Sequence, residues 1–234
     1  MSQINNKLRK RVALLETDTQ LAAVQQFTKA RMADDETGHG YDHIQRVVNN
    51  VKQLLAKETG ADQLVTISAA YLHDVTDDKL VEDVNAATDE LTNFLKETHF
   101  SEDQVAEILE IIANMSFSKS LNGQNAKPLP IEGQLVQDAD RLDAIGAIGI
   151  ARAIYFGGHF GEKLYDPEIA PRVEMTKADY RDLSNETIIN HFYEKLLKLK
   201  DRMNTNAAKE IATGRQKTML EFLDNFKDEW DGIQ

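Results

Sequence analysis

The sequence contains no cysteine, and this absence removes several kinds of site at once. Disulfide scaffolds, zinc sites built from thiolates and cysteine nucleophiles are excluded. A metal site in this chain must therefore use histidine, aspartate and glutamate, which suit harder divalent ions such as Mg²⁺, Mn²⁺ or Fe²⁺. The absence of disulfides is also compatible with a cytoplasmic location, which we expect.

Proline and long apolar runs are scarce as well. Only 4 prolines and 12 glycines among 234 residues favour helices over a turn-rich β fold. No stretch approaches the roughly 18 apolar residues of a membrane span, and the N-terminus lacks the apolar segment of a secretory signal. The formal net charge of −12 disfavours an extended nucleic-acid surface, which needs clustered lysine and arginine. We therefore expect neither a membrane nor extended nucleic acid as a partner.

Most of the chain repeats its apolar residues with the period of a helix. Ser101 and Gln104 have the spacing of a capping box, and Gly157 and Gly158 are expected to stop a helix. The pattern predicts one all-α domain over residues 1–234, with a helical extension over about 184–234. The expected helices lie within 4–32, at 42–56, 61–75, 102–114, 133–156 and 184–199 (capped by Ser184), and from Thr205 onward.

Two segments lack clean periodicity, residues 116–130 and 157–183. The second begins with glycines that suit a hinge, and it follows a helix that carries several aspartates. From its position alone we expect it to cover a functional site, where Tyr165 or Tyr180 would meet a base or a sugar.

The doublet His73-Asp74 ends an apolar helix, in the phrase AAYLHDV. Burying this pair is costly unless a partner satisfies it. A divalent metal is one such partner, since neutral imidazole and carboxylate both donate lone pairs to it. A hydrogen-bonded core pair is the alternative, and the doublet alone does not decide between the two.

Further candidate ligands stand on either side of the doublet. His43 begins a helix in GHGYDHIQRV, at the edge of its apolar stripe. Downstream, the phrase LVQDADRLDAIGA places Asp138, Asp140 and Asp143 within an otherwise apolar helix, where aspartate is a poor helix former. The residues by themselves leave the choice among these three carboxylates open.

This arrangement resembles the HD-domain phosphohydrolases, which carry a His, a His-Asp doublet and a distant Asp on helices of one bundle. The phrase ADRLDAIGA is similar to the last motif of that family, in which the aspartate of "ADR" is the ligand. The resemblance covers about residues 35–155 and is closest to small stand-alone bacterial HD hydrolases related to nucleotide pyrophosphohydrolases. It implies an HD-domain helical bundle that binds one divalent metal ion (Mn, Mg or Fe). The implied ligands are His43, His73, Asp74 and Asp140.

Four ligands leave about two positions open on an octahedral ion, one for a phosphate oxygen and one for water. The acidic pair Asp77-Asp78 follows the doublet at the offset found in the guanosine tetraphosphate hydrolases of this superfamily, which have Glu then Asp. The resemblance implies that Asp77 and Asp78 activate or position water. The alternative is that one of them caps the following helix.

Cations for the substrate phosphates are expected next to the metal motifs. Arg46 lies one turn after His43, and Lys79 follows the acidic pair. Each is equally consistent with a solvated surface charge.

The function expected from these features is metal-dependent hydrolysis of a small anionic nucleotide, with release of pyrophosphate from a nucleoside triphosphate. A nucleotide phosphomonoesterase and a non-catalytic, metal-bound nucleotide sensor are the alternatives. The oligomeric state stays open, with a homo-oligomer among the options.

Overall fold

The computed structural model describes residues 2–33, 40–78, 80–115, 128–172 and 187–233, with side chains from residue 15 onward. The described residues form α-helices and two short 3₁₀ turns, η1 and η2, and their one isolated β-bridge joins Lys163 to Thr187. The all-α prediction is confirmed. The helices are α1 (Ser2–Arg31), α2 (Tyr41–Leu55), α3 (Gln63–Leu72), α4 (Val84–Glu97), α5 (Glu102–Asn114), α7 (Ile131–Asp143), α8 (Gly146–His159), α10 (Ile188–Glu194) and α11 (Asn206–Trp230); η1 is Leu196–Lys198 and η2 is Lys200–Arg202.

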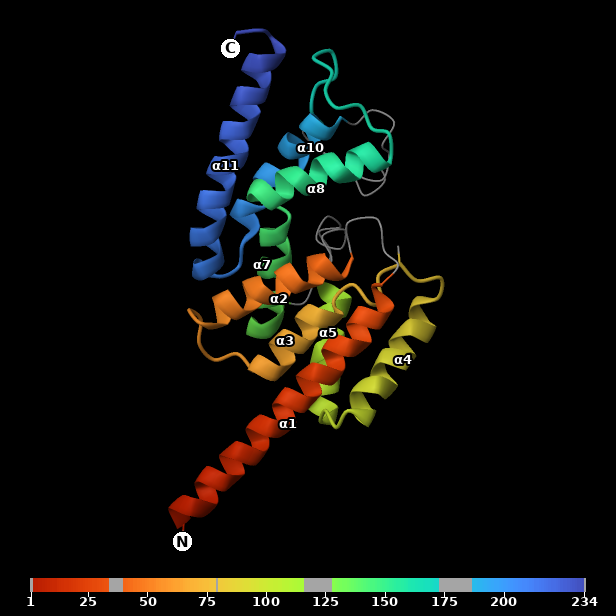
Figure 1. Cartoon of the computed structure of the whole chain (residues 1–234), viewed down its shortest axis with the longest axis vertical. Coiled ribbons are helices and arrows are strands. Elements are labelled where there is room, and N and C mark those ends of the chain that lie inside the picture. Colours follow the sequence, from red (N-terminus) through yellow and green to blue (C-terminus); the bar gives the residue numbers. More distant parts are fainter. Residues whose placement is uncertain (1, 34–39, 79, 116–127, 173–186, 234) are drawn as a thin grey trace.

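The helices α2, α3, α5 and α7 lie at the centre of the molecule (Figure 1). Helix α2 packs on both α3 and α7, and α3 also contacts α1 and α5. Helix α11 packs against α7 and α8. One hydrophobic cluster runs from Val24 in α1 to Leu223 in α11, so the last helices share the core of the central bundle. The limits expected for the domain and for its C-terminal extension stay predictions.

Side chains fix where several helices begin. Asp62 accepts from the backbone N–H groups of Leu64 and Val65 at the start of α3. Ser101 and Gln104 form the expected capping box at the start of α5. Thr205 caps α11, as expected. Such caps supply partners to N–H groups that have none within the helix.

Helix α4 was not expected from the sequence. It begins after Asp83, whose carboxylate accepts from the N–H groups of Asn85 and Ala86. Only Leu91 and Leu95 are fully buried along its 14 residues. Two buried positions give a weak periodic signal, because most of the helix surface faces solvent.

The single helix expected over residues 133–156 is wrong. The chain forms α7 and α8 instead, and Gly146, the first residue of α8, adopts φ +79°. Residues other than glycine rarely adopt that conformation, so Gly146 allows the chain to change direction between the two helices.

The expected stop at Gly157-Gly158 is also wrong, because α8 continues through both glycines to His159. A Cβ atom on Gly157 would lie 2.3 Å from Cγ1 of Ile188. The lack of a side chain at Gly157 therefore allows α8 to approach α10 closely, and this glycine does not break the helix.

The helix expected over residues 184–199 is shorter than predicted. Helix α10 spans Ile188–Glu194 and is capped by Thr187, whose hydroxyl accepts from the N–H of Asn190. The turns η1 and η2 follow it. Ser184 lies outside the described residues.

Within the described ranges, no helix has the length and the apolar character needed to cross a membrane.

Candidate metal centre

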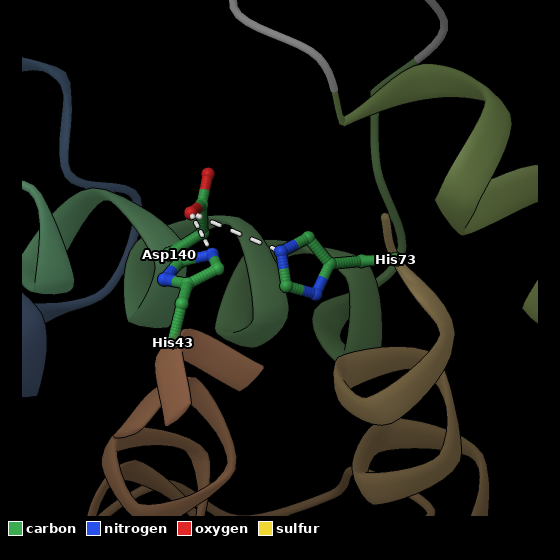
Figure 2. Close-up of side chains that lie close together, drawn as sticks. All are labelled: His43, His73 and Asp140. Atoms are coloured by element: carbon green, nitrogen blue, oxygen red, sulfur yellow. Dashed lines mark ion pairs between the residues drawn. The ribbon is translucent and has the colours of Figure 1, made fainter. Parts of the chain in front are cut away.

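Three side chains from three helices meet at one point of the central bundle (Figure 2). His43 stands in the first turn of α2, His73 is the residue that ends α3, and Asp140 lies in the last turn of α7. Both histidines are buried, whereas the Asp140 side chain is 40% exposed. The centre is therefore closed on the side of α2 and α3, and open to solvent beside Asp140.

The backbone fixes the orientation of His73. Its Nδ1 lies 2.8 Å from the carbonyl oxygen of Ala70. A carbonyl oxygen only accepts, so Nδ1 carries the proton and donates it, and Nε2 keeps a lone pair. That Nε2 is buried and has no hydrogen-bond partner in the described part of the chain. A buried lone pair without a donor is costly, and a metal ion is a partner that satisfies it.

The side chain of Asp143 orients His43 in the same way. Its Nδ1 lies 2.7 Å from Oδ2 of Asp143. Its Nε2 is directed at the two acidic residues of the centre, 3.5 Å from Oδ1 of Asp140 and 3.6 Å from Oδ2 of Asp74. Both imidazoles thus present Nε2 to the same space.

The spacing of these atoms fits one divalent ion. One ligand atom from each of His43, His73 and Asp140 lies within 4.8 Å of the other two. Nε2 of His73 is 3.4 Å from Oδ1 of Asp74 and 3.9 Å from Oδ1 of Asp140. Ligands at about 2.1 Å from an octahedral ion are about 3 Å apart when neighbouring and about 4 Å apart when opposite. His43, His73 and Asp140 therefore surround a space of the right size, and carboxylate oxygens of Asp74 lie 3.6 and 3.4 Å from Nε2 of His43 and of His73.

Asp143 holds His43 from the side away from the metal space. This carboxylate is buried, and it also accepts from Nε and Nη2 of Arg46 at 2.8 and 3.2 Å and from Nη1 of Arg152 at 2.7 Å. Burial would raise the pKa of Asp143, but the hydrogen bonds from His43 and Arg46 and the charge of Arg152 hold it far below the ordinary range. The carboxylate stays ionised, and an ionised acceptor keeps the proton of His43 on Nδ1.

Burial and the neighbouring charges act on the two imidazoles differently. Burial lowers the pKa of His43, and the hydrogen bond to Asp143 only partly opposes it. For His73 burial also acts downward, but the carboxylates of Asp74 and Asp140 raise the pKa overall. The negative field that attracts a proton to His73 is the field that attracts a divalent cation to the same place.

The structure separates the three aspartates of α7. Asp138 is fully buried and points away from the histidines, toward the start of α11. It accepts from the backbone N–H groups of Asn204 and Thr205, from the amide of Asn204 and from the hydroxyl of Thr205. Asp138 is therefore a structural carboxylate, Asp140 faces the histidines, and Asp143 supports His43.

The acidic pair lies on the turn that follows the doublet. The N–H of Asp77 donates to the carbonyl oxygen of Asp74 at 3.1 Å, which keeps this turn next to the centre. The alternative role of capping the next helix is wrong for both residues, because Asp83 caps α4. Asp77 is half-buried and Asp78 is exposed.

The residues predicted to contact the substrate lie in different places in the structure. Arg46 lies at the centre, with its guanidinium on Asp143 and on Oδ2 of Asp42 at 2.6 Å. Tyr165 packs its ring against Phe226 and Trp230, at 5.7 and 5.1 Å between centroids, so the expected contact to a base or sugar is not supported. Lys79, Tyr180 and residues 173–183 of the expected lid lie outside the described residues.

Sequence reasoning missed the roles of Asp143 and Arg152. Asp143 stands three residues after Asp140, one helical turn away, which is a signal that could have paired it with the site. Arg152 has no such local signal, because it belongs to a separate helix.

Comparison with known proteins agrees with this geometry. A model of the HD domain matches residues 40–145, a range that contains all four predicted ligands. The protein YpgQ of Bacillus subtilis is 36% identical over 92% of this chain and 95% of its own length. The chain belongs to the HD-domain superfamily, and it is an HD-superfamily hydrolase.

Solved structures extend the comparison to the fold. A protein of Lactobacillus plantarum is 50% identical, with a TM-score of 0.79 over 92% of this chain and 98% of that chain. An HD-superfamily hydrolase of Bacillus thuringiensis is 40% identical, with a TM-score of 0.73 over the same shares. The structure of YpgQ in complex with ADP has a TM-score of 0.71 at 31% identity, over 92% of this chain and 100% of that chain.

Proposed function

We propose that this protein is a metal-dependent phosphohydrolase that releases pyrophosphate from a nucleoside triphosphate. The observation that carries the proposal is the pair of buried imidazoles whose Nε2 atoms converge on Asp74 and Asp140. Each imidazole is oriented by a hydrogen bond at Nδ1, so Nε2 is ready to bind a cation.

In this proposal His43, His73, Asp74 and Asp140 hold one divalent ion. Two nitrogen and two oxygen ligands suit Mn²⁺, Fe²⁺ or Mg²⁺. Such an ion polarises a phosphate oxygen and lowers the pKa of a bound water. The exposed Asp140 side of the centre is where the phosphates would approach, because the side of α2 and α3 is closed by buried residues.

Asp77 and Asp78 are proposed to act on the attacking water. The backbone bond from Asp77 to Asp74 keeps this acidic turn within one turn of a metal ligand. A carboxylate there has the position needed to accept the proton that water loses on attacking phosphorus. Asp77 is the better placed of the two for the base, since it is half-buried while Asp78 is exposed.

A nucleotide substrate is supported by two observations. The related protein YpgQ was crystallised with ADP. In this chain the guanidinium of Arg46 lies beside the centre on Asp143, and its contact with the exposed Asp42 is an ordinary surface pair that a phosphate can replace. We propose Arg46 and Lys79 as the cations that bind the substrate phosphates.

The test is a panel of nucleoside mono-, di- and triphosphates incubated with the purified protein and Mn²⁺, in which pyrophosphate and orthophosphate are both measured. The proposal requires pyrophosphate from triphosphates. Orthophosphate from monophosphates would instead establish a phosphomonoesterase. Bound metal with no turnover of any nucleotide would favour a sensor.

Two variants and one control separate the roles of the residues. His73→Ala should lose the bound metal in elemental analysis, whereas His99→Asn should keep it, because His99 is exposed and its φ of 63° suits asparagine. Asp77→Asn should keep the metal and lose about 10²- to 10⁴-fold in kcat. Metal retained by His73→Ala would overturn the ligand assignment.

A further inference from the structure

Helix α8 passes beside the metal centre. Nη1 of Arg152, in the middle of α8, lies 2.7 Å from Oδ2 of Asp143. The same oxygen lies 2.7 Å from Nδ1 of His43. The side of α8 that carries Arg152 therefore faces Asp143 and the Nδ1 edge of His43, at the border of the centre.

Large apolar side chains are exposed on that same side. Residues four before, three after and four after a helical position share its face, which for Arg152 gives Ile148, Tyr155 and Phe156. These residues are 44%, 59% and 36% exposed. The buried residues Gly146 and Gly157 lie on another side of α8, which is the packed one, and the buried Gly149 stands between the two sides.

The aromatic surface continues past the end of the helix. The ring of Phe156 lies 4.6 Å from that of Phe160, which is itself 50% exposed. Tyr155, Phe156 and Phe160 together form what we call the α8 ledge. Clustered exposed aromatic residues beside a polar centre are typical of a surface that binds a ligand with a flat apolar part.

The position of the α8 ledge suits one part of a nucleotide. In the proposed function the metal centre binds the phosphates of the nucleotide. The remaining large group is the base, which is flat and stacks on aromatic rings. Tyr155 is three residues beyond Arg152, about 4.5 Å further along the helix axis. A base that follows its sugar away from the centre therefore meets the α8 ledge.

We propose that Tyr155 and Phe156 form the platform on which the base of the substrate stacks. The proposal rests on the proposed function, since it assigns the base of the same nucleotide. Every base has a face that can stack, so such a platform gives affinity with little choice among bases. The enzyme should accordingly accept purine and pyrimidine nucleotides with KM values within about tenfold of one another.

The experiment compares four proteins: the wild type, Tyr155→Ala, Tyr155→Phe and Ile154→Ala. Ile154 is a matched control. It is the residue before Tyr155 and is 40% exposed, but it lies on a different side of α8. The affinity for ADP is measured by calorimetry in the presence of Mn²⁺, and KM and kcat are measured with ATP and CTP. Inorganic tripolyphosphate, which has no base, is tested as a competitive inhibitor.

Tyr155→Ala should weaken ADP binding and raise both KM values about tenfold, with kcat within twofold. Tyr155→Phe keeps the ring and should behave as the wild type, as should Ile154→Ala. The inhibition constant of tripolyphosphate should not change in any variant. An equal loss for tripolyphosphate, or unchanged ADP binding by Tyr155→Ala, would overturn the proposal.

The experiment also distinguishes failure of the proposed function, and formation of a dimer, from failure of the base-stacking proposal. If the wild type hydrolyses no nucleoside triphosphate, the proposed function fails, but the ADP affinities still decide whether the α8 ledge binds a base. Sedimentation of the wild type and Tyr155→Ala tests whether the ledge instead joins two copies of the chain. A dimer that dissociates in the variant with ADP affinity unchanged would reassign the ledge and overturn its role in base binding.

Discussion

His43 and Arg152 bond to the same carboxylate oxygen of Asp143, each at 2.7 Å. A candidate metal ligand from α2 and an arginine from α8 are thus joined through one atom of α7. The other oxygen of Asp143 accepts from Arg46. The two arginines keep this buried carboxylate ionised, and the ionised carboxylate holds the proton of the neutral imidazole on Nδ1, so that the Nε2 lone pair of His43 is directed at the centre.

Replacing Asp143 should therefore weaken metal binding although Asp143 is not a ligand. For Asp143→Asn we expect about a 10- to 100-fold loss in Mn²⁺ affinity, measured by calorimetry. Asp201→Asn, which removes an exposed carboxylate of η2, serves as the control. Unchanged affinity in Asp143→Asn would show that the packing of α2 alone orients His43.

In the proposed function, Asp42 competes with the substrate phosphates for Arg46. Its side chain is 72% exposed and contacts Nη1 of Arg46, while Nε and Nη2 of that arginine stay on Asp143. Asp42→Asn should thus release one guanidinium nitrogen for phosphate and lower KM for the nucleotide about two- to threefold, whereas Arg46→Ala should raise it. Steady-state kinetics checks both, and an increase of KM in Asp42→Asn would contradict a phosphate contact by Arg46.

The two adjacent glycines of α8 should respond in opposite directions to alanine. A Cβ on Gly157 would lie 2.3 Å from Cγ1 and 2.5 Å from Cδ1 of Ile188, whereas a Cβ on Gly158 meets nothing within 4 Å. We expect Gly157→Ala to lower the free energy of unfolding by about 1–3 kcal/mol. Gly158→Ala should raise it by about 0.5–1 kcal/mol, because alanine is the better helix former. Urea unfolding measures both, and adding Ile188→Ala should reduce the loss caused by Gly157→Ala.

Glu107 opposes folding at neutral pH. Burial and the nearby carboxylates of Glu132 and Asp62 raise its pKa in the folded protein. A raised pKa means that the folded state favours the protonated form, so this contribution to stability is present below the unfolded pKa and is lost as pH rises through the folded one.

Glu107→Gln should thus be slightly more stable than the wild type at pH 7 and equal to it near pH 3.5, by urea unfolding at the two pH values. The gain should be small, because Glu107 is only partly buried and water screens it. Glu16→Gln, on the exposed surface of α1, is the control. A variant less stable than the wild type at pH 7 would contradict the assignment.

The sequence was most informative where polar residues interrupt apolar helices. His73 stands at a position that a core would give to an apolar side chain, and the structure brings it together with Asp140. The choice of Asp140 over Asp138 and Asp143 came from a family motif. Nothing in the local pattern distinguishes these three carboxylates, because what separates them is the partner that each one meets.

Those partners lie far away along the chain. Asp143 meets Arg46 across 97 residues, and Asp138 meets Thr205 across 67. Periodicity describes one helix at a time and carries no information on such pairs. The same limit explains why a helix stop was wrongly expected at Gly157. The sequence does not distinguish a glycine that ends a helix from one that leaves room for a residue of another helix, here Ile188 of α10.

The carboxylate of Asp138 also limits how the HD region can be separated from the rest of the chain. The HD match ends at residue 145, but this buried carboxylate, two residues before a candidate ligand, depends for its donors on Asn204 and Thr205. A fragment cut at the limit of the match would leave the carboxyl group in the interior without those donors, which is strongly unfavourable. We therefore expect the recognisable motif and the smallest piece that folds to be different lengths of chain, and we expect that transplanting the motif into another protein would require carrying the start of α11 with it.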